Sequence, residues 1–425
     1  MQSKIRGVVG ILGFGVDGQG VAEWLVTQDA VDRILVFDDK VSNAEVQKFR
    51  KAEIGSTLEG IDLLFRSPGF PLIHPLIADA KKREILITSS TREVLKNFSG
   101  NTVGITGSNG KTTCTALIQE FLKGEYGEER VERGGNDGVP RLDLIEQKKE
   151  DCFLVLELSS FQLIDSEYSP NVAVVLNVTP NHLDWHRDMG EYAEAKRQIV
   201  AHPPSPRSAG LRRGKSERQI AVLNQNDPIV KKFAEGIKSD VHWFTDDVPF
   251  DQIRVKSHPD TIRAAITAAR ALKVSESTIL KVLQEFKGVP HRIEFVRELD
   301  GIKYYNDSSC TTPESAIVAC EAFEKGSLTI LLGGRDKKMD FSNLYEVIKE
   351  RDVAVVPYGE MAATFQKNIP TSYHLQTTTS FEEAIQAARS TGRPNIVLSP
   401  SCTSFDMFKN AKERGKKFGE IVQSF

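Results

Sequence analysis

A lysine and several hydroxyl side chains follow a glycine-rich stretch, at a point where they could bind phosphate. The stretch reads Thr106-Gly-Ser-Asn-Gly-Lys-Thr-Thr113 and lies between an apolar run and a segment of helical pattern. Glycines at such a turn let backbone N–H groups converge on a phosphate, and the positive N-terminal end of the following helix attracts the anion. Lys111 can then reach the β and γ phosphates, and the Thr112 hydroxyl can bind Mg²⁺. The predicted ATP contacts are Gly107, Ser108, Asn109, Gly110, Lys111, Thr112 and Thr113.

The spacing of this loop differs from that of the common P-loop, which needs a glycine where this chain has Ile105. Gly107-x-x-Gly110-Lys-Thr is a shorter variant. A plain glycine turn between a strand and a helix is the alternative. We favour the phosphate site, because a Lys-Thr-Thr sequence at a helix start is otherwise hard to explain.

A second glycine-rich stretch, Gly13-Phe-Gly-Val-Asp-Gly18, follows the apolar run Val8–Leu12. Asp38 stands twenty residues past Gly18, after another apolar run, as in the dinucleotide fingerprint. The alternative is a similar turn that binds another nucleotide or none, and a second nucleotide site at Lys111 makes a dehydrogenase less favoured. Ser67-Pro-Gly69 ends a further strand, where sheets of this kind bind ligands.

Three more side chains are candidates for a role in metal binding or catalysis at the phosphate site. The buried strand 152–157 ends in Glu157, which is either a Mg²⁺ ligand or an acid at the sheet edge. His182 lies in Asn177-Val-Thr-Pro-Asn-His-Leu-Asp184, after the strand 172–176, and is either a second metal ligand or a surface histidine. Lys196 lies on the helix 191–199, where its spacing cannot distinguish it from a solvated lysine.

The elements that must position these residues alternate between strand and helix along the chain. This pattern predicts an α/β protein of parallel sheets in three units. The first, residues 1–98, is Rossmann-like; the second, 99–287, carries the phosphate loop; the third, 288–425, is again Rossmann-like. Substrates would then meet across the clefts between the units.

Composition bounds the possible partners. The 425 residues are 40% hydrophobic and 27% charged with a net charge of −3, so nothing favours nucleic acid or an acidic membrane surface. We see no leader sequence and no apolar run long enough for a membrane span. The five cysteines form no C-x-x-C pair, which favours a reducing compartment, the cytoplasm. We expect a monomer acting on small molecules. The basic run 203–218 is interpreted as a solvated loop, with a polyanion patch as the alternative.

Taken together, the motifs resemble the Mur ligase family over nearly the whole chain. Besides the phosphate loop, the resemblance rests on Leu156-Glu-Leu-Ser-Ser-Phe-Gln-Leu163, Asn177-Val-Thr-Pro-x-His182-Leu-Asp184, Pro290-His-Arg292 and Leu398-Ser-Pro-x-Cys402-x-Ser404-x-Asp406-x-Phe408-Lys-Asn410. The stretch from Leu156 to Leu163 is typical of members that add D-glutamate to UDP-N-acetylmuramoyl-L-alanine. The resemblance implies this reaction, an ATP-dependent amide formation through an acyl phosphate, with ATP and Mg²⁺ as cofactors.

The resemblance also implies roles for single residues. The first unit then binds UDP in place of a dinucleotide. The muramoyl-substrate contacts are Val16, Asp17, Asp38, Ser67, Asn136, Ser159 and Gln162. The metal ligands are Thr112, Glu157, His182 and Lys196, the last as a carbamate. The catalytic residues are Lys111, Lys196 and His182. The further ATP contacts are Arg292 and Asp307, and the amino-acid contacts are Thr311, Lys337 and Ser404.

The chain departs from the family pattern at a few of these places. Asp17 stands where a small hydroxyl residue is usual, Ser309 where many members have a lysine, and Ala411 where an aromatic residue lines the amino-acid pocket. The segment near the adenine is reduced to His258-Pro-Asp-Thr261. The alternatives are a Mur-type ligase for another amino acid such as L-glutamate, a folate-polyglutamate-type ligase, and a ligase relic without catalysis.

Overall fold

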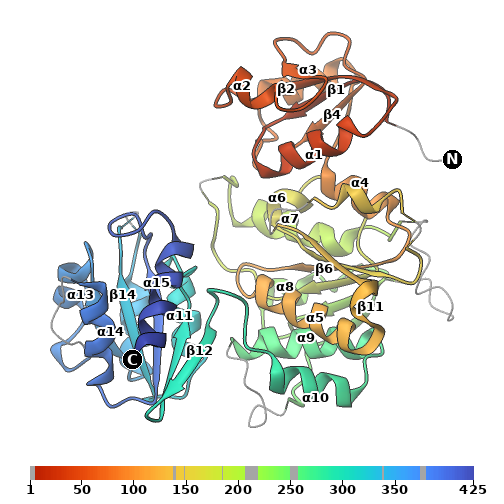
Figure 1. The fold of residues 1–425 in the computed structure, drawn as a ribbon. Coiled ribbons are helices and arrows are strands. Elements are labelled where there is room, and N and C mark those ends of the chain that lie inside the picture. Colours follow the sequence, from red (N-terminus) through yellow and green to blue (C-terminus); the bar gives the residue numbers. More distant parts are fainter. Residues whose placement is uncertain are drawn as a thin grey trace. The chain divides into compact units, whose positions relative to one another are not determined.

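The computed structural model describes residues 5–136, 140–147, 149–183, 185–205, 219–248, 257–336, 339–373 and 380–425. Within these residues the strands form three sheets flanked by helices (Figure 1), which confirms the predicted α/β class. The chain divides into two compact units. One joins Met1–Asp246 with Ala264–Thr278 and holds the first two sheets; the other joins Asp247–Arg263 with Ile279–Phe425 and holds the third. The domain boundaries near residues 98 and 287 stay predictions.

The first sheet is parallel, with the strand order β3-β2-β1-β4-β5. Its strands are β1 (Gly7–Leu12), β2 (Val31–Phe37), β3 (Ala52–Ile54), β4 (Leu63–Arg66) and β5 (Leu86–Thr88), and its helices are α1 (Val16–Val26), α2 (Asn43–Val46), α3 (Pro75–Lys82) and α4 (Ser90–Asn97). Val9 and Ile11 pack into one buried cluster and Leu12 into another, because parallel strands are covered on both faces. The strand order reverses between β1 and β4, the switch point at which such sheets bind ligands.

The second sheet is also parallel, with the order β11-β10-β9-β6-β8-β7. Its strands are β6 (Asn101–Thr106), β7 (Val131–Gly135), β8 (Phe153–Glu157), β9 (Val172–Val175), β10 (Ile220–Leu223) and β11 (Asp240–Trp243). The accompanying helices are α5 (Lys111–Tyr126), α6 (Ser160–Leu163), α7 (Met189–Ala201), α8 (Pro228–Lys232), α9 (Pro259–Ala271) and α10 (Glu276–Glu285), with the short 3-10 helices η1 (Glu128–Arg130) and η2 (Leu142–Leu144). The phosphate loop leaves β6 between its neighbours β8 and β9, so residues at their carboxyl ends flank it.

The third sheet has the order β12-β13-β16-β14-β15 and is parallel except for the β12–β13 pair, which is antiparallel. Its strands are β12 (Glu294–Leu299), β13 (Ile302–Asn306), β14 (Leu328–Gly333), β15 (Ala354–Tyr358) and β16 (Asn395–Ser401). The helices are α11 (Pro313–Glu321), α12 (Ser342–Glu350), α13 (Ala362–Asn368), α14 (Phe381–Arg389) and α15 (Ala411–Ser424), with the 3-10 helix η5 (Thr371–Tyr373). Two buried apolar clusters of its own stabilise this unit.

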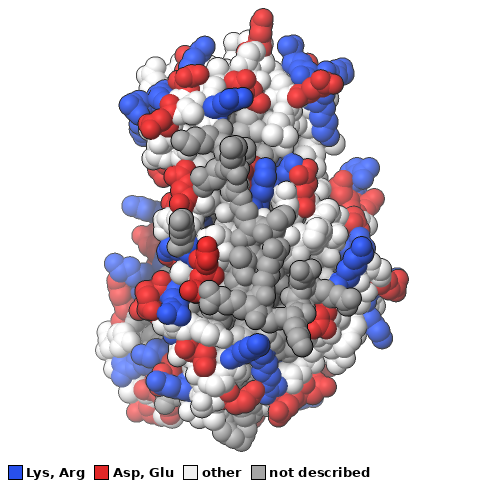
Figure 2. Space-filling model, turned by 90° about the vertical axis from the view of Figure 1, so that its right-hand side faces the viewer, with Lys and Arg blue, Asp and Glu red and all other residues white. Residues whose placement is uncertain are grey.

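The surface is mixed in charge. On the face drawn in Figure 2, acidic and basic side chains are interspersed among the described residues, in keeping with the net charge of −3. No helix within the described ranges is long and apolar enough to cross a membrane. Most of the basic run, residues 206–218, lies outside the described part of the chain, and its interpretation stays a prediction.

Candidate active site

The phosphate loop joins β6 to α5, as its sequence predicts. Gly110 is the N-cap residue of α5 and has a φ of 83°, a conformation that glycine adopts without steric cost. The helix starts at Lys111. Within the described chain no side chain caps this N-terminus, so its first backbone N–H groups can point at a bound anion.

The segment after β9 holds the loop in shape. The backbone N–H of Ser108 donates to the Asn177 carbonyl over 2.8 Å, and that of Asn109 donates to Asn177 Oδ1 over 2.9 Å. Asn177 Nδ2 donates back to the Asn109 carbonyl over 3.2 Å. These hydrogen bonds fix the loop to the segment that follows β9.

The side-chain nitrogens of two lysines donate to one carbonyl at the loop. Lys111 Nζ donates to Gly107 O over 2.9 Å and to Ser108 O over 3.1 Å, and Lys196 Nζ donates to Gly107 O over 2.9 Å. The Lys196 side chain is buried beside the Tyr192 ring. Burial, and next the charge of Lys111, lower the pKa of Lys196 well below its ordinary value of 10.5. The neutral amine of Lys196 therefore forms more readily than that of an exposed lysine.

Glu157 ends β8 beside the loop, where it pairs in register with Ile105 of β6. It is only 4% exposed, and its Oε1 accepts from Asn136 Nδ2 over 3.1 Å. Its Oε2 is buried and finds no hydrogen-bond donor in the described residues. A buried carboxylate oxygen without a donor requires a compensating partner, and a hard cation such as Mg²⁺ fits it.

His182 is less clearly part of this centre. It is exposed, has a φ of 54°, and packs edge-on against the Phe161 ring with the centroids 4.9 Å apart. No group of three or more histidine, cysteine, aspartate or glutamate side chains in the described ranges could hold a metal ion. The metal role of His182 stays a prediction, and Asp184 lies outside the described residues.

A cavity of about 600 Å³ opens at the switch point of the first sheet. Every residue predicted to contact the muramoyl substrate lines it, namely Val16, Asp17, Asp38, Ser67, Asn136, Ser159 and Gln162. Residues from the first sheet form one wall, and residues that follow β7 and β8 of the second sheet form the other. The structure thus brings together residues that are up to 146 positions apart in the sequence.

Polar groups of the first sheet hold this cavity open. Asp38 Oδ2 accepts from the Phe14 backbone N–H over 2.8 Å and its Oδ1 from that of Lys40 over 2.9 Å. The carboxylate therefore fixes the glycine turn in addition to facing the cavity. Ser67 Oγ donates to the Gly13 carbonyl over 2.7 Å, which joins the two turns at the switch point.

Asp17 lies in the first turn of α1 and is partly buried. Its Oδ1 accepts from Ser90 Oγ over 2.5 Å, and its buried Oδ2 accepts from no donor in the described part of the chain. Burial raises the pKa of Asp17 above its ordinary value of 3.8, while the Ser90 hydrogen bond and the charge of Arg66 oppose the change. A carboxyl group at a helix N-terminus competes with any phosphate that the helix would bind.

On the opposite wall, Ser159 and Gln162 form a capping box around α6. Gln162 Oε1 accepts from the Ser159 backbone N–H over 2.9 Å, and Ser159 Oγ accepts from the Gln162 N–H over 3.4 Å. This explains why serine and glutamine occur three residues apart. The Asn136 backbone N–H donates to the Glu157 carbonyl over 2.7 Å, so this wall is tied to the carboxylate beside the phosphate loop.

Two predicted ATP contacts lie at the edge of the third sheet. Asp307 follows β13 and is fully buried; its Oδ2 accepts from Ser399 Oγ over 2.7 Å and its Oδ1 from the Ile293 N–H over 3.3 Å. Burial raises the pKa of Asp307 to about 7, against the hydrogen bond from Ser399 and the charge of Arg292. Arg292 itself is exposed.

The amino-acid contacts leave neighbouring strands of that sheet. Thr311 follows β13 and Ser404 follows β16, and these strands pair in register. Arg414 of α15 is fully buried between the two loops. Its Nη2 donates to Ser308 O over 2.9 Å, and both Nη atoms donate to Cys402 O over 3.2 Å. Lys337 lies outside the described residues.

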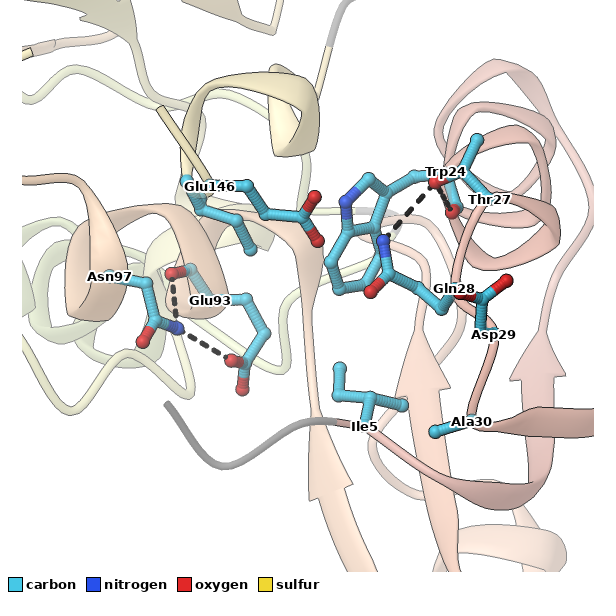
Figure 3. A pocket seen from close by; sticks show the side chains of 10 residues that line it. Ile5, Trp24, Thr27, Gln28, Asp29, Ala30, Glu93, Asn97 and Glu146 are labelled. Carbon is cyan, nitrogen blue, oxygen red and sulfur yellow. Dashed lines mark hydrogen bonds between the residues drawn. The ribbon is translucent and has the colours of Figure 1, made fainter. Parts of the chain in front are cut away.

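A second cavity, of about 310 Å³, is lined by residues from the first 97 positions of the chain and by Ile145 and Glu146 (Figure 3). Trp24, Gln28 and Asp29 line it on one side and Glu93 and Glu146 on the other. Glu93 accepts hydrogen bonds from Thr88 and Asn97. The carboxylates of Asp29, Glu93 and Glu146 would repel the phosphates of a nucleotide, so this cavity does not suit one.

Known proteins share both the sequence and the fold of this chain. A family model described as the Mur ligase middle domain matches residues 105–266. The UDP-N-acetylmuramoylalanine–D-glutamate ligase of Acetivibrio thermocellus is 35% identical and aligns over 98% of this chain and 96% of its own. The chain belongs to the Mur ligase family. The ligase of the same name from Clostridium perfringens is 33% identical, over 98% of this chain and 96% of its own.

Solved Mur ligases have the same architecture. The MurF ligase from Thermotoga maritima in complex with ADP is 19% identical, with a TM-score of 0.56 over 100% of this chain and 96% of its own. The UDP-N-acetylmuramate–alanine ligase MurC of the same organism is 16% identical, with a TM-score of 0.53 over 98% and 99%. The likeness in fold confirms the predicted α/β architecture of a Mur ligase.

Proposed function

We propose that this Mur ligase joins D-glutamate to UDP-N-acetylmuramoyl-L-alanine at the expense of ATP, in the synthesis of peptidoglycan precursors. One observation carries the proposal: Glu157 and Asn136 connect the phosphate loop to the cavity lined by the predicted muramoyl contacts. A carboxylate held in that cavity would be next to the phosphate that it must attack. The names of the relatives and the ADP bound to the related MurF support the same reaction.

A carboxylate is a poor acyl donor, so the substrate carboxylate first attacks the γ-phosphate of ATP, which gives an acyl phosphate and ADP. Lys111 and the uncapped N-terminus of α5 neutralise the charge that develops on the transferred group. Thr112, Glu157, His182 and carbamylated Lys196 would hold Mg²⁺, which supplies further positive charge at the phosphates. The predicted Arg292 and Asp307 contacts would hold the nucleotide from the third sheet.

The amine of the amino acid then attacks the acyl carbon, and inorganic phosphate leaves. Thr311, Lys337 and Ser404 are proposed to hold the amino acid. A lysine can pair with the side-chain carboxylate of an acidic substrate, which favours glutamate. Because Ser309 replaces the lysine usual in the family, we expect glutamate to bind more weakly than in members that keep it. Positioning supplies much of the rate, since little covalent chemistry falls to the protein.

Phosphate release with UDP-N-acetylmuramoyl-L-alanine, ATP and a panel of D- and L-amino acids tests this proposal. D-glutamate should give the highest kcat/KM. Lys111→Ala should lower turnover by ~10²-fold or more, as for other groups that stabilise transition-state charge. Calorimetry should show that the variant still binds the muramoyl nucleotide, because the cavity is lined by other residues than Lys111.

Two results would contradict the proposal. More than about a tenth of wild-type turnover in Lys111→Ala would remove the phosphoryl-transfer role, given the losses typical of such groups. A neutral amino acid as the better substrate would overturn the assignment of glutamate.

A further inference from the structure

Arg66 is a buried cation to which the proposed reaction gives no role. It is the last residue of β4, and its side chain is 0% exposed. A guanidinium group removed from water needs a carboxylate and further acceptors around it. Nε and Nη2 of Arg66 donate to the two carboxylate oxygens of Asp165 over 2.7 and 2.8 Å. This bidentate pair joins positions 99 residues apart in the chain.

The same side chain shapes the turn that follows β4. Arg66 Nη1 faces the carbonyl oxygens of Ser67 at 3.3 Å, Pro68 at 3.1 Å and Phe70 at 3.3 Å. These residues, with Gly69, line the muramoyl cavity. Arg66 Nη1 thus contacts three carbonyl oxygens of one turn. This turn forms the first-sheet wall of the cavity.

The remaining contact of Arg66 reaches the opposite wall. Its Nη2 donates to the carbonyl of Phe161 over 2.9 Å. Phe161 belongs to α6 and lines the cavity beside Ser159 and Gln162, and Asp165 follows this helix closely. The guanidinium group therefore lies behind both walls and contacts each of them.

We propose that Arg66 is a positioning residue, which with Asp165 holds the Ser67–Phe70 turn and α6 at the separation needed to bind the muramoyl nucleotide. The inference rests on the proposed function, because it assigns the cavity to that substrate. Only a planar group with several fixed N–H donors can meet a carboxylate and carbonyls on two sides at once. A lysine at position 66 would keep the charge and lose this geometry.

The chain offers a closely matched control for the experiment. Glu167, two residues after Asp165, pairs with Arg92 of α4, but it is 57% exposed and does not line the cavity. Asp165→Asn and Glu167→Gln are the same chemical change at neighbouring positions, each against an arginine from the first-sheet region. They differ in that only Asp165 holds the group that contacts both walls.

Steady-state kinetics on Arg66→Lys, Asp165→Asn and Glu167→Gln test the inference. We expect the first two to raise the KM for the muramoyl nucleotide at least about tenfold, the range for loss of a charge-assisted hydrogen bond. The KM for ATP should stay within about twofold of the wild-type value, because the phosphate loop keeps its hydrogen bonds to Asn177. Glu167→Gln should leave both constants within about twofold, as for other exposed ion pairs.

Chemical rescue of a variant that lacks the arginine side chain distinguishes a positioning role of Arg66 from a general loss of structure. Guanidinium ion added to Arg66→Ala should lower the raised KM for the nucleotide without changing the KM for ATP. An unchanged nucleotide KM in both Arg66→Lys and Asp165→Asn would overturn the role of Arg66 and leave the proposed function intact. An equal effect of Glu167→Gln, or an equal rise in the KM for ATP, would overturn it as well.

Binding of UDP alone distinguishes failure of this inference from failure of the proposed function. Wild-type protein without ligase activity on the whole amino-acid panel would contradict the function. Calorimetry with UDP then still tests Arg66, since the cavity walls remain the binding surface. UDP bound equally by the wild type, Arg66→Lys and Asp165→Asn would overturn the inference, and weakening of about tenfold in both variants would support it.

Discussion

Lys196 has surroundings that favour an uncharged amine. Burial and the neighbouring Lys111 lower its pKa, so the proton leaves at a lower pH than from an exposed lysine. Only the neutral amine can add CO₂ to form a carbamate, the anion expected at this position from the family resemblance. The low pKa therefore supports the proposed modification in a way that the sequence spacing could not.

Lys196→Ala should consequently be almost inactive, because the site loses an anion that would hold Mg²⁺. Formate or acetate should restore part of the activity by occupying the vacated space with a carboxylate. Phosphate release measured with and without each anion checks this prediction. An active enzyme whose native mass spectrum shows only unmodified Lys196 would remove the carbamate hypothesis.

Asp17 introduces a pH dependence at the muramoyl cavity. A diphosphate at the N-terminus of α1 would further favour the protonated carboxyl group, whose pKa burial already raises above 3.8. Substrate affinity should thus be highest below the pKa of Asp17 and fall as the pH rises through it. The family residue at this position, a small hydroxyl, carries no charge and lacks this dependence.

Asp17→Asn keeps the shape of the side chain and removes its charge. At pH 8 it should lower the KM for the muramoyl nucleotide about fivefold, the equivalent of ~1 kcal/mol of repulsion between like charges in water. The KM for the muramoyl nucleotide should vary less with pH in the variant than in the wild type. A higher KM in Asp17→Asn at every pH would instead show that the carboxylate contacts the substrate favourably.

At the scale of elements, the phosphate loop depends on the strand beside it. Asn177, just past β9, accepts from the backbone N–H of Asn109 and donates to its carbonyl. Asn177→Ala removes both side-chain contacts and should raise the KM for ATP about tenfold, the value of one or two hydrogen bonds. The KM for the muramoyl nucleotide should stay unchanged. Asn181→Ala, at an exposed position in the same segment, is the control that should leave both constants as they are.

The apolar strands and the loop before α5 were predictable because their patterns are local. The predicted strands Val8–Leu12 and 172–176 coincide with β1 and β9 to within one residue. β7 and β12 could not be predicted in this way. Val131-Glu-Arg-Gly-Gly135 has no apolar run, and β12 carries charged residues because it is an antiparallel edge strand with a partly exposed surface.

The candidate site was predictable only where a local motif marks it. Asp38 and Ser67 each come directly after a strand of the first sheet, so their place at the cavity follows from the fold. Asn136 and Gln162 came from the family resemblance alone. The contacts of Arg66 and Asn177 join segments 99 and 68 residues apart, and no spacing within the sequence announces them. The roles of such residues can be recognised only in the folded structure.

At the scale of the whole molecule, the chain forms two compact units with separate buried clusters. Asp307 lies in the second unit, and its pKa of about 7 in the folded protein exceeds its ordinary value of 3.8. The folded state therefore binds a proton more tightly than the unfolded state does. The contribution of Asp307 to the stability of the folded protein is complete below about pH 4 and disappears as the pH rises through about 7.

Calorimetric unfolding should consequently show two transitions that respond to different conditions. The muramoyl nucleotide should raise only the transition of the first unit, because its cavity lies entirely there. At about 100 times its dissociation constant a ligand adds ~2.7 kcal/mol to the free energy of unfolding.

Raising the pH from 5 to 8 should lower the transition temperature of the second unit by several degrees, and Asp307→Asn should remove most of that change. If one transition moved with both the ligand and the pH, the two units would unfold together, and the separate buried clusters would not be independent in stability.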